Sequence, residues 1–271
     1  TDHGVMYGAV EFYNACKAEG IKPIIGCEVY VAPRTRFDKE AGIDQHPYHL
    51  VLLCENNEGY RNLVKLVSAA GIEGFYNRPR VDKELLRKHH KGLICLSACL
   101  AGEIPRLLSD GNYNGAKEAA LTYLEIFGEN NFFIEIQNHG LEDELKNLPM
   151  LYKLSDETGI PLVATNDCHY INKEDSNIQD ILLCVQTGRI LGEPGGLSFE
   201  TKEFYLKSCE EMEKLFKGHE EAVSVTAEIA ERCNVEFEFG KLNHYVGNYT
   251  SYTEQKKQIF ARQQAAYRHQ Q

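Results

Sequence analysis

Short apolar runs alternate with amphipathic helical patterns along most of this 271-residue chain. The runs are rich in β-branched residues and end at glycine or polar residues, which is typical of buried strands. This alternation predicts an α/β fold with a largely parallel sheet and helical crossovers, open or closed into a barrel. Strands are expected at 21–31, 48–54, 93–97, 132–137 and from Pro161, and helices at 6–20, 57–70, from 101, 113–127, 142–158, 175–187, 208–216 and 220–232.

Three segments do not fit this alternation. Residues 34–46 are polar and irregular and are expected to form a loop, whereas 71–82 shows no clear period. A further polar loop is expected through Gly195 and Gly196. From Asn248 onward the chain carries Gln, Tyr, Lys and Arg with little apolar order, which predicts a frayed helix or disorder without an assigned function.

The composition narrows the functional classes. The net charge is −11, whereas a domain that grips nucleic acid by itself is usually basic, so contact with DNA would need metal ions or other segments. The nine cysteines are odd in number and scattered, and several lie inside apolar runs. That pattern favours reduced thiols in a cytosol over a disulfide framework. No CxxC pair is present, and no segment resembles a signal peptide or a membrane span.

The strand that begins at Pro161 is followed by residues that could bind a metal ion. Side chains two apart in an extended chain point to the same face, so Asp167 and His169 are expected to project together from the strand end. A carboxylate oxygen beside an imidazole nitrogen can bind a divalent cation. The alternative is a strand that stops at a turn, with Asp167 as a turn residue and His169 on the surface.

Other residues of ligand type occur in or just after predicted strands. Each has an ordinary explanation: Glu28 as an outward-facing strand residue, His49 as a core histidine, and Cys99 as a small buried thiol. His3, beside Asp2 in a turn-like start, is individually weak. In a barrel of parallel strands the strand ends converge on one face. The placement of all these ligand-type residues in or just after strands therefore favours a metal cluster over a chance arrangement.

Several longer motifs carry a resemblance to a known family. TDHG, PIIGCEVYV, YHLVLLCENNEGYRNLVKLVS, EGFYNRPRVD, LICLSACLAGEIPRLL and PLVATNDCHY resemble the PHP domain of bacterial replicative DNA polymerases, the DNA polymerase III alpha subunits, as do ILLCVQTGR, FYLKSCEEMEKLF and IAERCNVEF. The resemblance implies a distorted, TIM-like (β/α)7 barrel over 1–241 and leaves 242–271 as a divergent tail. It also implies a barrel incomplete at the N-terminus, because the family's first strand, with its His-x-His pair, would precede Thr1.

The resemblance further implies a cluster of divalent ions, usually three, and metal-dependent phosphoester hydrolysis that includes 3′–5′ proofreading. Zn²⁺ suits the His- and Cys-containing ligands, and Mn²⁺ or Mg²⁺ the oxygen-rich part. Such ions would activate water and neutralise phosphate charge. Asp167 is also expected to be catalytic, and His139, just past FFIEIQ, either protonates the leaving group or lies in a surface turn. The implied metal ligands are His3, Glu28, His49, Cys99, Asp167 and His169.

Two other functions compete with hydrolysis. A non-catalytic PHP domain would stabilise the polymerase and dock a separate exonuclease, and a free-standing phosphatase would act on small phosphate esters. The retained ligands favour hydrolysis, and EGFYNRPRVD, away from the site, argues against the phosphatase. The expected partners are DNA, through the parent polymerase, and other subunits of the polymerase holoenzyme. The protein is expected in the cytoplasm, and no membrane is expected among its partners. With the upstream ligands missing, the fragment is expected to bind metal without meaningful exonuclease activity.

Overall fold

The structure is a computed structural model that describes residues 1–188, 190, 200–237 and 257. The chain divides into two compact units, Thr1–Glu236 and Phe237–Gln271. The sheet and the candidate site lie in the first unit. The polar loop expected through Gly195 and Gly196 lies outside the described residues, as does all of the tail expected from Asn248 except Lys257.

Within the described residues, the strands form one mixed, seven-stranded sheet. Its main path runs β1-β2-β3-β5-β6-β7, and the short β4 pairs with β2 beside that path. β5, β6 and β7 are buried along their whole length, as expected for strands covered on both faces. The strands are β1 (Asp2–His3), β2 (Gly26–Val31), β3 (Tyr48–Cys54), β4 (Arg80–Val81), β5 (Leu93–Leu96), β6 (Phe132–Ile136) and β7 (Leu162–Ala164).

The predicted parallel arrangement holds for only part of the sheet. Among the described strands, four pairs are parallel: β1 with β2, β2 with β4, β5 with β6, and β6 with β7. In contrast, β3 runs antiparallel to both β2 and β5. The connection 32–47 contains no helix, so the chain returns directly alongside β2 without a crossover. No ladder in the described part of the chain joins β1 to β7, so closure into a (β/α)7 barrel is not confirmed.

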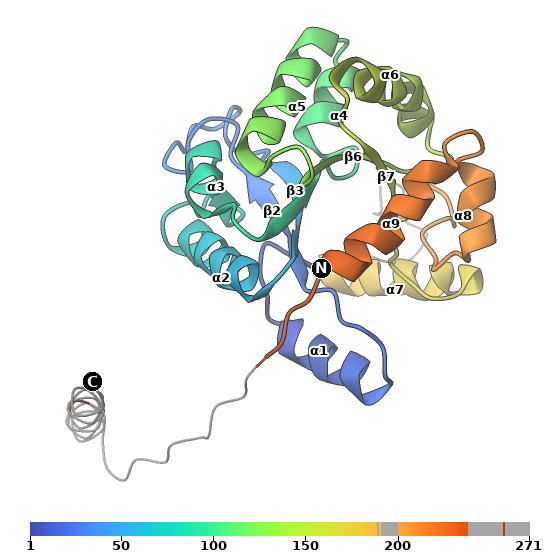
Figure 1. The fold of residues 1–271 in the computed structure, drawn as a ribbon, viewed down its shortest axis with the longest axis horizontal. Helices are drawn as coiled ribbons and strands as arrows, with labels where there is room; N and C mark the ends of the chain where they lie inside the picture. The colour runs from blue at the N-terminus through green and yellow to red at the C-terminus, as the bar shows by residue number, and fades with distance from the viewer. Residues whose placement is uncertain (189, 191–199, 238–256, 258–271) are drawn as a thin grey trace. The chain divides into compact units, whose positions relative to one another are not determined.

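Helices cover the sheet and close the core. Figure 1 shows α2, α3, α5, α4 and α6 arranged in that order around the strands, with α9 beside β7. One core cluster joins Ile94, Phe133 and Val163 of the sheet to Ile229 of α9, and each such buried side chain contributes roughly 1.5–3 kcal/mol. The helices are α1 (Ala9–Ala18), α2 (Asn57–Ile72), α3 (Lys83–His89), α4 (Glu103–Ser109), α5 (Tyr113–Phe127), α6 (Glu142–Thr158), α7 (Ser176–Thr187), α8 (Cys209–Leu215) and α9 (Glu220–Arg232).

Local sequence accounts for several helix boundaries. α5, α6 and α9 have the predicted bounds. The side chain of Asn56 accepts hydrogen bonds from the first turn of α2, and Ser208 with Glu211 forms a capping box at the start of α8. α3 and β4 were not predicted: β4 has only two residues and lies in the segment 71–82, which shows no clear period, and the short α3 follows that segment directly.

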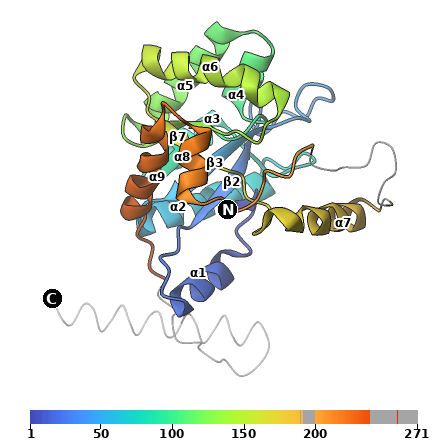
Figure 2. The same cartoon turned by 90° about the vertical axis from the view of Figure 1, so that its right-hand side faces the viewer.

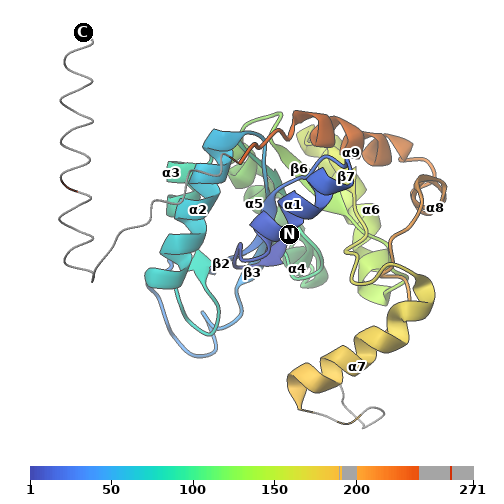
Figure 3. The same ribbon diagram turned by 90° about the horizontal axis from the view of Figure 1, so that it is seen from below.

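Helix α7 extends away from the body of the first unit (Figures 2 and 3). Ile178, Ile181, Leu182 and Val185 recur on it at helical spacing and are 49% to 75% exposed. Among the described residues, this helix therefore carries an apolar stripe that faces away from the core. No helix in the described part is long and apolar enough to cross a membrane.

Candidate metal centre

β2 and β3 carry the first two residues of the candidate site. Glu28 is the third residue of β2, and His49 is the second residue of β3. The antiparallel register places Tyr30 opposite His49 and Val51 opposite Glu28, so Glu28 and His49 are diagonal neighbours. The start of β3 therefore meets β2 near its end. The two residues meet through antiparallel pairing and not through the parallel strand ends that the sequence suggested.

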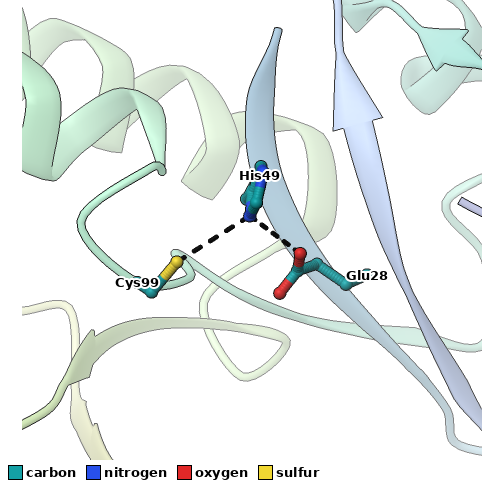
Figure 4. Close-up of side chains that lie close together, drawn as sticks. All are labelled: Glu28, His49 and Cys99. Atoms are coloured by element: carbon teal, nitrogen blue, oxygen red, sulfur yellow. Dashed lines mark hydrogen bonds and ion pairs between the residues drawn. The ribbon is translucent and has the colours of Figure 1, made fainter. Parts of the chain in front are cut away.

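Glu28 is the centre of a small polar group. Its Oε1 lies 2.8 Å from Nδ1 of His49 and 2.9 Å from Nδ1 of His3. The sulfur of Cys99 lies 3.8 Å from the same His49 nitrogen. The ligand atoms of Glu28, His49 and Cys99 all lie within 4.8 Å of one another. Figure 4 shows His49 between the other two side chains. We name Glu28, His49 and Cys99 the metal triad.

The Glu28 carboxyl stays ionised although its side chain is only 9% exposed. Burial raises the pKa of Glu28, but hydrogen bonds from His3 and His49 outweigh burial and lower that pKa to about 2. The same hydrogen bond to Glu28 raises the pKa of His3, against the effect of burial. The carboxylate is therefore fully ionised at neutral pH and can act as a negatively charged ligand for a cation.

Cys99 reaches the triad from a loop that follows β5. That strand ends at Leu96, and Ala98 adopts a φ of 66°. The N–H of Gly102 donates to the carbonyl of Cys99 at 2.8 Å, which closes the loop. Burial raises the pKa of the Cys99 thiol to about 12, so it is protonated at neutral pH and must lose its proton to bind a metal. All nine cysteines lie in the described part and are free thiols, as predicted.

Asp167 and His169 form a second pair beside the triad. β7 ends at Ala164 and Asp167 has a φ of 40°, so the predicted extended strand does not continue to these residues. Nδ1 of His169 instead lies 2.6 Å from the backbone oxygen of Asp167 and 3.9 Å from its Oδ1. The pKa of His3 is raised chiefly by its hydrogen bond to Glu28, and that of Cys99 chiefly by burial. The negative charge of Asp167 adds a smaller increase to the pKa of each. This coupling indicates that Asp167 lies near them.

The structure therefore brings the predicted metal ligands into two neighbouring groups. The metal triad forms the first, and His3 joins it through Glu28. His3 lies in β1, opposite Glu28 in a parallel pair, and not in the turn-like start that the sequence suggested. Asp167 and His169 form the second group. A single ion cluster bound by all six residues stays a prediction.

His139 has an environment that neither prediction described. Its side chain is 0% exposed, so the alternative of a surface turn is wrong. Nδ1 lies 2.6 Å from Oε1 of Glu144, Nε2 lies 2.9 Å from the backbone oxygen of Asn166, and the ring stacks on Phe204. With both ring nitrogens occupied, these contacts favour holding the Asn166 peptide, next to Asp167, over donating a proton to a leaving group.

Buried polar groups behind the site were missed from the sequence. Glu135 of β6 is 4% exposed, and its place inside the apolar run FFIEIQ is the signal that could have revealed it. The side chain of Asn166 donates to the carbonyls of Glu203 and Tyr205, and Nζ of Lys207 donates to its Oδ1 at 3.0 Å. The Lys207 side chain is only 2% exposed, and nothing in its local sequence indicates this.

The chemistry of the triad fits a divalent cation. A carboxylate oxygen, an imidazole nitrogen and a sulfur are ligand types of zinc sites, and here they converge within 4.8 Å. The side chain of His49 is 26% exposed, so the group is reached from solvent. Such an arrangement can hold an ion and leave room for a further ligand, which is the form of a catalytic site more than of a closed structural one.

Comparison with known families gives the class to which this chain belongs. A family model described as PHP domain matches residues 1–139, which include His3, β2, β3 and the Cys99 loop. The chain belongs to the PHP domain family. A second match, to a model described as ABC transporter, covers residues 235–271, which is too little of the chain to define a family.

Curated relatives of this chain at 41–49% identity carry the name DNA polymerase III subunit alpha. That of Treponema pallidum is 49% identical over 97% of this chain and 24% of the relative. Those of Borreliella burgdorferi and Deinococcus radiodurans are 47% and 45% identical, over 86% and 90% of this chain and 20% and 19% of the relatives. The chain thus spans about a quarter or less of these relatives. The Treponema alignment covers so much of the chain that it reaches into the segment 242–271.

Proposed function

We propose that this chain is the PHP portion, residues 1–241, of a DNA polymerase III alpha subunit, followed by a tail at 242–271. The parent protein would be a cytoplasmic DNA-directed DNA polymerase whose partners are DNA and other subunits of the replicative holoenzyme. The names of the relatives, at 41–49% identity, support this parent. The site itself would hydrolyse phosphoester bonds and remove 3′-terminal nucleotides in proofreading. The observation that carries this part is the metal triad, with Oε1 of Glu28 shared between two imidazoles.

In this proposal the metal triad holds Zn²⁺, or alternatively Mn²⁺ or Mg²⁺, and Asp167 with His169 supplies further ligands. A divalent ion bound there would polarise the phosphate and activate water for attack. Glu28 brings a full negative charge, since its pKa is about 2, and it orients both His3 and His49. His139 acts through the Asn166 peptide, which it holds beside Asp167.

A second candidate function is a scaffold that stabilises the polymerase and docks a separate exonuclease. The observation that favours it is the apolar stripe on α7, with Leu182 56% and Val185 75% exposed. Exposed apolar patches are frequent sites of protein interaction. The two functions call on different parts of the chain, so substitutions can separate them.

The test is a chimera in which this chain replaces the matching segment of the Treponema pallidum subunit. With Zn²⁺ or Mn²⁺, we expect it to release a labelled 3′ nucleotide from single-stranded DNA. Glu28→Gln and Asp167→Ala should lower the release at least about tenfold, since each removes a ligand, while synthesis from a paired primer continues. Glu58→Gln, an exposed glutamate on α2, is the matched control.

Release that the Glu28 and Asp167 substitutions leave unchanged would show that the site does not carry the nuclease activity. The scaffold function predicts another pattern. The unsubstituted chimera would then release no nucleotide under any metal condition, and Leu182→Asp on α7 would lower the melting temperature of the polymerase or its capture of an exonuclease subunit.

A further inference from the structure

Two loops carry three of the six predicted ligands of the candidate metal centre, Cys99 on one and Asp167 with His169 on the other, and one buried carboxylate touches both loops. We infer that Glu135 is a positioning residue that holds the Cys99 loop and the Asp167 loop at a fixed separation. The inference rests on the proposed metal site, which it deepens. Glu135 makes no hydrogen bond to any of the six predicted ligands, and it acts through their neighbours.

The sheet explains why Glu135 can reach both loops. β6 lies between β5, which precedes the Cys99 loop, and β7, which precedes the Asp167 loop. Oε2 of Glu135 accepts a hydrogen bond from the N–H of Ala98 at 2.9 Å. Oε1 accepts one from Oγ1 of Thr165 at 2.5 Å and one from Nε2 of Gln137 at 3.2 Å. Each oxygen of the carboxylate therefore anchors one loop.

Backbone strain shows why the loops need anchors. Asn77, Ala98 and Asp167 are the non-glycine residues with positive φ in the described part of the chain, and two of these three belong to the ligand loops. Ala98 is bonded to Glu135 directly and precedes Cys99, while Thr165 is bonded to Glu135 two residues before Asp167. Such conformations are disfavoured for residues with a Cβ and persist only where surrounding contacts impose them.

The need for a carboxylate follows from the donors that surround it. Ala98, Thr165 and Gln137 all donate, so the position requires acceptors on both sides. Glutamine offers one acceptor oxygen, and its amide group faces a donor on the other side. Glu135→Gln should therefore keep one loop in place and release the other, whereas Glu135→Leu should release both.

Cobalt binding to the 271-residue chain tests this inference, because a bound Co²⁺ gives a near-ultraviolet charge-transfer band only where a thiolate coordinates it. We expect Glu135→Gln to weaken the apparent Co²⁺ affinity about 10- to 100-fold, the range for residues that orient ligands, and Glu135→Leu to weaken it further and to remove the thiolate band. Asp82→Asn, which alters another buried carboxylate bonded to Arg36, should leave both readouts unchanged.

Thr165 provides a second pair of variants that keep Glu135 itself. Thr165→Val removes the bond on the Asp167 side only, so it should weaken Co²⁺ binding but keep the Cys99 band, and Thr165→Ser should restore the affinity. If Glu135→Gln proves unfolded by circular dichroism, this pair decides the question. Native Co²⁺ affinity in Glu135→Gln, or in Thr165→Val, would overturn the positioning role. A native chain without any thiolate band would instead refute the proposed metal site.

Discussion

Glu135 should make the metal-free chain less stable as the pH rises from 4.5 to about 7. Burial raises its pKa from the ordinary 4.5 to about 7, although hydrogen bonds from Thr165 and Ala98 oppose this, and the charges of Asp167 and Glu28 add to the rise. The folded chain then binds the proton more tightly than the unfolded chain does. Below pH 4.5 both forms are protonated. Between pH 4.5 and 7 the unfolded chain ionises first, so stability falls, and above the folded pKa the loss is complete.

The size of this effect follows from the two pKa values. Each unit of difference corresponds to about 1.36 kcal/mol, so the interval from 4.5 to about 7 amounts to a loss of about 3 kcal/mol. That is a large share of the roughly 5–15 kcal/mol by which domains are usually stable. About 2–3 kcal/mol of this loss falls between pH 5 and pH 8.5.

Urea unfolding with a chelator at pH 5 and pH 8.5 measures the effect. His3, whose raised pKa contributes stability that is also lost as the pH rises, titrates in an overlapping range. The native chain is therefore compared with Glu135→Gln, which keeps His3 but cannot ionise at position 135. We expect the native chain to lose about 2–3 kcal/mol more than this variant between the two pH values. A difference between the two proteins that stays within about 1 kcal/mol across that range would refute the reasoning.

Two further predictions concern packing. A Cβ added to Gly59 of α2 would lie 1.7 Å from the carbonyl oxygen of Gly92, so Gly59→Ala should lower the free energy of unfolding by more than about 3 kcal/mol. A Cβ added to Gly71 in the same helix meets nothing within 4 Å, so Gly71→Ala should raise the free energy of unfolding by about 0.5–1 kcal/mol. Equal urea midpoints for the two variants would contradict this. Arg80 is 0% exposed, and its guanidinium donates hydrogen bonds to four backbone carbonyls. Arg80→Met should therefore lower the free energy of unfolding by about 3–5 kcal/mol. The control Arg87→Met, at an exposed position, should lower it by less than about 0.5 kcal/mol. Similar melting temperatures for these two would count against that role of Arg80.

Long helices could be predicted from the sequence, and short or non-local features could not. The segments 113–127 and 142–158 are long enough to show helical periodicity, and their bounds are confirmed. β4 consists of Arg80 and Val81 only, and it exists because β2 offers a parallel partner from a distant part of the chain. The direction of β3 depends on how the helix-free segment 32–47 folds back, which periodicity does not report.

The candidate site shows the same division. Residue type and strand placement were sufficient to select Glu28, His49 and Cys99, which the structure brings together. The route by which they meet was predicted wrongly, because it depends on the antiparallel register of β3. Asp167 lies beyond the end of β7 in a left-handed conformation, and His139 is enclosed by partners distant in sequence. Tertiary contacts of this kind leave no periodic trace in the sequence.

Zinc affinity of the 271-residue chain, measured by competition with a chromophoric chelator, tests the metal triad most directly. We predict at least one bound Zn²⁺, with an affinity at least about tenfold weaker after Cys99→Ser or Glu28→Gln. Cys209→Ser, which alters an exposed cysteine outside the site, should bind as the native chain does. A Cys99→Ser chain with the same zinc affinity as the native chain would contradict the assignment of Glu28, His49 and Cys99 as a metal centre.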